Sequence, residues 1–233
     1  ALTIDPENDD AYLGRSFVKT YLNDASAKLD ADKANEIKLR KKTRLLEQNP
    51  NDTTAFVKSV VQDSFSASPE SAIEGLTKAI QIDPKCAECY RRRGFSYYRT
   101  KNYIKAEEDY GKAIEIEPNN AENYFMRGGF FKDRSSVLDK VQYFDRAVTD
   151  YTKAIELDSK NEQYFAARAW AYAFSKNYAA AAADWGQYIS FKTDDPERYI
   201  LRGDAFREMK DWTKAVTDYS KAIELNPHNV EYY

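Results

Sequence analysis

Apolar and polar residues alternate along the chain with the spacing of amphipathic helices. Residues 87–120 show this best, in two sets whose members are four and three residues apart: Tyr90, Gly94 and Tyr97, then Ala106, Tyr110 and Ala113. Residues at these intervals lie on one face of an α-helix. Thr100-Lys101-Asn102 separates the sets, and we expect Asn102 to tolerate the left-handed conformation that a tight helix–helix turn needs. The pattern predicts two antiparallel helices.

The same pattern recurs with a period of 34 residues, the distance between Pro84 and Pro118. The segment 113–118 is repeated at 79–84 and 222–227, and at 154–159 without its proline. This period divides the chain into units at 9–52 (long and divergent), 53–86, 87–120, 121–161 (with an insertion), 162–195 and 196–229, with partial repeats at 1–8 and 230–233. Repetition of this kind predicts a solenoid, in which each unit is buried by its neighbours.

The order of small and aromatic residues resembles the tetratricopeptide repeat (TPR) family, whose units run aromatic, small, aromatic, Ala, aromatic, Ala, Pro. Residues 196–229 follow the whole pattern through Tyr199, Gly203, Phe206, Ala215, Tyr219, Ala222 and Pro227. Ser159 replaces the proline in 121–161, Tyr188 and Thr193 depart in 162–195, and the first two units match least. The resemblance implies an all-α fold, a right-handed solenoid (superhelix) of antiparallel helix pairs.

Both chain ends continue the repeat pattern and neither has a polar capping helix, so we expect 1–233 to be a single array cut from a longer one. Two units exceed 34 residues. In 121–161, about seven residues enter between Phe131 and Phe144, where we expect longer helices; the alternative is a protrusion that contacts a partner. In 9–52, about ten residues enter around 23–26, where we expect a loop.

An arginine precedes the small residue of the first helix in five units: Arg15, Arg93, Arg127, Arg168 and Arg202. An aspartate stands in a matching place on the second helix in four of them: Asp109, Asp150, Asp184 and Asp218. This correlation predicts an Arg–Asp pair that joins the two helices of a unit, rather than an anion-binding ladder. The unit at 53–86 has lost both residues, and in the first unit Arg15 is expected to face Lys41.

The composition of the chain argues against several classes of function. The net charge is −3 with 31% charged residues, so no nucleic-acid partner is expected. No apolar run approaches the roughly 20 residues of a membrane span, so we expect no membrane partner; a cytoplasmic location is favoured. The chain has one histidine and no glycine-rich phosphate loop, so we expect no enzyme activity, no cofactor and no metal.

Two local motifs carry a competing functional interpretation. Cys86-Ala87-Glu88-Cys89 is a single C-x-x-C without the further ligands of a zinc site, and we expect ordinary buried or junction cysteines; a redox role is left open. The basic run Lys38–Arg44 is interpreted as a solvated helix face, with an acidic partner or a membrane surface as the alternative.

The family resemblance also implies a concave surface lined by the first helices, where a partner binds. Its lining positions contain more large side chains than packing requires, and we predict a groove formed by Arg91, Phe95, Tyr98, Phe125 and Trp170. The alternative is that neighbouring units bury some of these residues. The predicted function is a protein–protein interaction scaffold or adaptor that binds a partner peptide or helix. The alternatives are a regulatory or targeting module of a larger enzyme-containing protein, and self-association.

Overall fold

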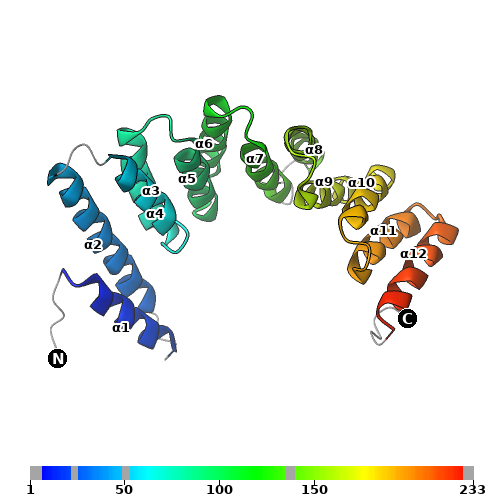
Figure 1. The fold of residues 1–233 in the computed structure, drawn as a ribbon, viewed down its shortest axis with the longest axis horizontal. Coiled ribbons are helices and arrows are strands. Elements are labelled where there is room, and N and C mark those ends of the chain that lie inside the picture. The colour runs from blue at the N-terminus through cyan, green and yellow to red at the C-terminus, as the bar shows by residue number, and fades with distance from the viewer. Residues whose placement is uncertain (1–6, 22–25, 49–52, 135–139, 228–233) are drawn as a thin grey trace. The chain divides into compact units, whose positions relative to one another are not determined.

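The computed structural model describes residues 7–21, 26–48, 53–134 and 140–227 (Figure 1). These residues form twelve α-helices and no strand, which confirms the all-α class. The chain divides into two compact units, Ala1–Pro118 and Asn119–Tyr233. The first unit contains α1 (Asp9–Tyr21), α2 (Ala27–Gln48), α3 (Thr53–Asp63), α4 (Pro69–Ile82), α5 (Ala87–Arg99) and α6 (Tyr103–Ile116). The second contains α7 (Ala121–Arg134), α8 (Lys140–Leu157), α9 (Glu162–Phe174), α10 (Tyr178–Phe191), α11 (Pro196–Glu208) and α12 (Trp212–Leu225).

Within each unit the helices pack in chain order. In each unit every helix contacts the next helix of that unit; in addition, α2 contacts α4, α3 contacts α5, and α7 contacts α9. Odd-numbered helices are therefore the first helices of pairs, and even-numbered helices are the second. Since each helix touches only near neighbours in the sequence, each unit is a stack of antiparallel helix pairs, as the repeat period predicts.

The tight turns inside three pairs share one backbone geometry. Lys101, Lys176 and Lys210 have φ values of 62°, 63° and 61°, in the left-handed region. In the first of these turns, Lys101 N donates to Tyr98 O at 2.9 Å and Asn102 N donates to Tyr97 O at 2.8 Å. These two bonds form a Schellman motif, which satisfies the last carbonyls of α5. The prediction for Asn102 was therefore wrong: Lys101 takes the left-handed conformation.

Asn102 has a different task in this turn. Its φ is −86° and its side-chain oxygen accepts a hydrogen bond from the backbone N–H of Lys105, so Asn102 is the N-cap of α6. Asn177 and Asp211 cap α10 and α12 in the same way. One short turn thus ends the first helix with a lysine and starts the second with an Asn or Asp.

The small residues of the repeat pattern occupy the contact between the two helices of a pair. Ala106, Ala113, Ala147 and Ala181 are all fully buried. At Gly128 an added Cβ would lie 2.8 Å from Cε1 of Tyr151. Contacts this short leave no room for any side chain at Gly128, so its identity sets how closely α7 and α8 approach.

In each of the two long units the second helix is longer than in the other repeats. The second helix α8 has 18 residues, whereas α6 has 14, which confirms the expected helix extension in 121–161. In 9–52, α1 ends at Tyr21, and α2 already begins at Ala27 and runs for 22 residues. Additional residues of this unit therefore lengthen the second helix, and the loop expected around 23–26 falls largely on residues 22–25. Residues 22–25 and 135–139 themselves lie outside the described part of the chain.

Candidate functional site

The predicted Arg–Asp pairs join the two helices of four repeats. In each, arginine Nε and Nη2 reach the two carboxylate oxygens of one aspartate at 2.7–2.8 Å, for the pairs Arg93–Asp109, Arg127–Asp150, Arg168–Asp184 and Arg202–Asp218. The aspartates are buried, and the bidentate geometry fixes each guanidinium in one orientation. The arginine row is thus a structural device, as the sequence predicted.

The first unit has the same pair in a different register. Arg15 Nε donates to Asp30 Oδ2 at 2.7 Å, and Lys19 Nζ lies 2.8 Å from the same oxygen. The prediction that Arg15 faces Lys41 was wrong, because α2 is lengthened beyond the pairing position; Lys41 instead pairs with Asp9. Chiefly through its hydrogen bond, the Arg15 guanidinium lowers the pKa of Asp30 to about 2.

Two of these arginines also reach back to the preceding second helix. Arg93 Nη1 donates to Thr77 Oγ1 at 3.2 Å, and Arg168 Nη1 donates to Thr152 Oγ1 at 3.0 Å. Each of the two therefore connects three helices. Gly186 stands at the corresponding place before Arg202, where an added Cβ would lie 3.6 Å from the Arg202 Nη1 atom.

A second repeating position escaped the sequence analysis. The third residue of α5, α7, α9 and α11 is buried in all four helices, although the residues are Cys89, Asn123, Tyr164 and Arg198. Tyr164 hydroxyl lies 3.5 Å from Glu122 Oε2 of the preceding first helix. No repeated residue type marks this position, so pattern matching could not reveal it.

Arg198 makes the most extensive of these contacts. Its Nη1 donates to Glu162 Oε2 at 2.7 Å and to the carbonyl oxygen of Tyr188 at 2.5 Å, and its Nε lies 3.4 Å from Asp195. Its guanidinium also lies over the Tyr188 ring, 3.8 Å from the centroid. A buried guanidinium with three kinds of partner holds successive helix pairs of the second unit in one arrangement.

Three of the five predicted groove residues lie on α5. Phe95 is exposed and its ring centroid lies 6.3 Å from that of Tyr98, which in turn contacts the Tyr103 ring at 6.2 Å. The side chain of Arg91 is largely covered and lies 3.6 Å from Glu88. In the first unit, Phe95 is thus the predicted groove residue with most side-chain surface available to a partner.

The other two predicted groove residues lie in the second unit and differ in exposure. Phe125 on α7 is half-buried between the rings of Tyr151 and Tyr164, at 5.8 and 5.0 Å. Its neighbours bury it, as in the alternative interpretation. Trp170 on α9 remains 42% exposed, with its ring stacked on Phe174 at 5.7 Å and edge-on to Trp185 at 5.3 Å.

Phe174 extends this aromatic surface and was not predicted. It is 57% exposed and stacks on Phe144 of α8 at 5.9 Å, so Trp170 and Phe174 form a continuous exposed aromatic pair one helical turn apart. The spacing of four residues from Trp170 is the signal that could have identified it.

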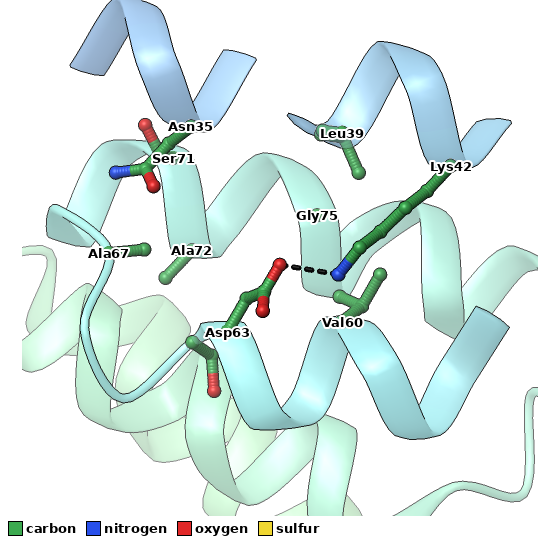
Figure 2. Close-up of a pocket in the computed structure, with 10 residues that line it drawn as sticks. Asn35, Leu39, Lys42, Val60, Asp63, Ala67, Ser71, Ala72 and Gly75 are labelled. Atoms are coloured by element: carbon green, nitrogen blue, oxygen red, sulfur yellow. Dashed lines mark hydrogen bonds and ion pairs between the residues drawn. The ribbon is translucent and has the colours of Figure 1, made fainter. Parts of the chain in front are cut away.

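The first unit contains a small cavity between α2, α3 and α4 (Figure 2). Lys42 and Asp63 extend toward each other across it as an ion pair, and Lys42 Nζ also lies 3.3 Å from the carbonyl oxygen of Ser59. Gly75, which stands where other repeats have the paired aspartate, lines the cavity. The cavity has a volume of about 30 Å³, which is enough for water molecules only. This ion pair joins α2 to α3, whereas each Arg–Asp pair joins the two helices of one repeat.

The two cysteines lie at the junction of α4 and α5, as predicted, and they form a disulfide that the sequence analysis did not predict. Cys86 is the N-cap of α5, and its Sγ accepts a hydrogen bond from the backbone N–H of Cys89 at 3.1 Å. In the described residues no group of three or more His, Cys, Asp or Glu side chains is placed to hold a metal ion.

The basic run on α2 is largely compensated by carboxylates. Arg40 pairs with Glu36, Lys41 with Asp9 and Lys42 with Asp63. This pairing favours the interpretation as an ordinary helix face. Across the parts of the chain that the structure describes, no helix is both long enough and apolar enough to cross a membrane.

Comparison with known proteins finds similarity to repeat proteins, both in sequence and in structure. Family models described as tetratricopeptide repeat match residues 87–120 and 133–161, and a TPR repeat model matches 203–233. Curated protein sequences gave no match. YrrB, a TPR protein with an unusual peptide-binding site, has a similar structure, with a TM-score of 0.64 and 19% identity over 82% of this chain and 95% of YrrB.

Two other solved structures show the same likeness. The MamA protein gives a TM-score of 0.64 and 20% identity over 78% of this chain and 96% of MamA. TTC0263, a thermophilic TPR protein of Thermus thermophilus, gives a TM-score of 0.55 and 16% identity over 77% of this chain and 94% of TTC0263. At such identities the likeness shows the fold.

Proposed function

Because the chain belongs to the tetratricopeptide-repeat family, we propose that this protein-interaction scaffold binds an extended or helical peptide segment of a partner protein. Each of the two units offers its own binding surface on a first helix. In the first unit it consists of the exposed Phe95 with the partly exposed Tyr98 and the largely covered Arg91 on α5, and in the second unit it consists of the exposed Trp170 and Phe174 on α9. The mechanism is binding alone. Preformed helices reduce the entropy lost on association, and aromatic rings bury apolar groups of the partner.

The observation that carries the proposal is the exposed pair Trp170 and Phe174. Trp170 rests on the buried Trp185 and Phe174 rests on Phe144, so both rings are held in place before any partner arrives. Rigid exposed aromatics of this kind are typical binding hot spots, because ordering them costs little entropy. YrrB, which has the same fold, is a peptide-binding protein, and this supports a peptide as the ligand.

Phe125 has a supporting role in the proposed surface. Its ring packs between Tyr151 and Tyr164, so it holds the first helices of the second unit together and presents only part of its area. We expect its substitution to lower stability as well as binding, which makes it a poor probe of the surface.

Peptide selection tests the function directly. Peptides selected on the whole chain from a random library are measured by fluorescence anisotropy against the wild type, Phe95→Ala and the double variant Trp170→Ala, Phe174→Ala. Trp212→Ala serves as the matched control, because Trp212 is 61% exposed but lies on a second helix, α12. All variants are checked for unchanged helicity by circular dichroism.

We expect the double variant to weaken binding by about tenfold or more, the range of a hot-spot residue. Trp212→Ala should bind as the wild type does. Loss with Phe95→Ala alone would assign the surface to α5. Equal affinity of all variants, or loss only in Trp212→Ala, would contradict binding on the first helices.

A further inference from the structure

The Cys86–Cys89 disulfide lies at the start of α5, between the residue that caps the helix and its third residue. A bond between residues three apart closes a very short loop and removes little entropy from the unfolded chain. The core around Cys89 also contains many apolar side chains besides the cysteines, among them Val60, Leu76 and Ala79. A contribution to folding stability is therefore a weak explanation for the presence of this disulfide.

The two sulfurs differ in accessibility. Cys89 has no exposed surface and belongs to the core formed by α2, α3, α4 and α5, whereas Cys86 is partly exposed at its edge. Thiol–disulfide exchange requires a thiolate to approach one sulfur directly. Only Cys86 offers that approach in the folded protein.

The helix end also stabilises the reduced state. The first backbone N–H groups of an α-helix point outward without partners and carry a partial positive charge, which stabilises an anionic sulfur. The N–H of Cys89 already points at the Cys86 sulfur at 3.1 Å. A disulfide whose reduced form is stabilised in this way is easier to reduce than a structural one.

We propose that Cys86 and Cys89 form a redox-active pair that exchanges electrons with a dithiol, with Cys86 as the attacked sulfur. The thiolate of the dithiol attacks Cys86 Sγ, the Sγ–Sγ bond breaks, and its electron pair goes to Cys89 Sγ, which takes a proton from water. The second thiol of the reductant, after losing its proton, then attacks the reductant's own sulfur in the mixed disulfide and releases Cys86 as a thiolate. Two electrons pass to the protein, and the dithiol is oxidised to a disulfide.

The test is a redox titration of the folded, full chain in mixtures of reduced and oxidised dithiothreitol, with thiols trapped by N-ethylmaleimide and counted by mass. The expected result is reversible reduction of the pair in the absence of denaturant. Maleimide should then label Cys86 at least about tenfold faster than Cys89, as peptide masses of the reduced wild type can show.

Two single variants serve as controls. Cys89→Ala leaves Cys86 as an accessible thiol and should react rapidly, whereas Cys86→Ser keeps a capping side chain and leaves Cys89 buried and slow. The proposal is overturned if reduction requires unfolding, if no disulfide forms in oxidised dithiothreitol, or if both cysteines of the reduced wild type are labelled at the same rate.

Discussion

The ion pair between Arg198 and Glu162 is unequal: the arginine side chain is 6% exposed, whereas the glutamate is 33% exposed. Removing the glutamate leaves a buried cation whose one remaining carboxylate contact is the longer one to Asp195, but removing the arginine leaves a carboxylate that water can reach.

We therefore predict that Glu162→Ala lowers the free energy of unfolding by about 3 kcal/mol. Arg198→Met, which retains an apolar side chain of similar length, should cost about 1 kcal/mol. Urea denaturation of both variants measures the difference. A larger loss for Arg198→Met would show that its contacts with Tyr188 outweigh the charge effect.

Gly186→Thr should stabilise the second unit. Gly186 lies inside α10, where glycine costs about 1 kcal/mol relative to alanine, and there is space for a side chain beside Arg202. Gly186→Ala isolates the helix-propensity gain. Because threonine is a poorer helix former than alanine, a threonine variant as stable as the alanine one would indicate a hydrogen bond to Arg202, like that between Thr152 and Arg168.

Replacing the left-handed lysines with glycine should also stabilise the protein. Lys101, Lys176 and Lys210 have φ near 60°, a conformation that disfavours residues with a Cβ by about 1–2 kcal/mol. After the larger unfolded-state entropy of glycine is deducted, we expect about 0.5 kcal/mol for Lys101→Gly. Lys112→Gly, inside α6, is the control and should destabilise by about 1 kcal/mol. Thermal unfolding compares the two, and destabilisation in both would contradict the turn geometry.

The connection between α1 and α2 should weaken in acid. The pKa of Asp30 is about 2 in the folded chain and about 3.9 when unfolded, so its contribution is complete above about pH 5 and is lost as the pH falls from there toward about 2. Since Arg15 is partly exposed, we expect only about 1 kcal/mol. The stability difference between the wild type and Asp30→Asn should shrink over that pH range in urea titrations. A constant difference would rule out this linkage.

Sequence periodicity predicted the features that repeat. The helix pairs, the buried alanines and the Arg–Asp pairs such as Arg93–Asp109 all follow from residue spacing, because each recurs at a fixed distance in several units. The partner of Arg15 was predicted wrongly because the additional residues of that unit fit the sequence pattern equally well in a turn or in a helix. Helix propensity alone did not distinguish the two.

The features that do not repeat could not be predicted from the sequence. Arg198, Phe174 and the cysteine disulfide each occur once, so no internal comparison singles them out. For Phe125 the sequence predicted the position correctly but not the exposure of the side chain. Its position matches the expected groove lining, but its exposure depends on the neighbouring Tyr164, a residue 39 positions away.

The buried third residue of α9 and of α11 has a consequence for the order of the repeats. Tyr164 is matched to Glu122, and Arg198 is matched to Glu162, so these two junctions of the second unit differ in their chemical complement. Exchanging repeats 162–195 and 196–229 would set these side chains beside the wrong neighbours, although every repeat would still obey the common pattern. The repeats therefore share a shape but are not interchangeable, and the linear order of the array is itself encoded at its junctions.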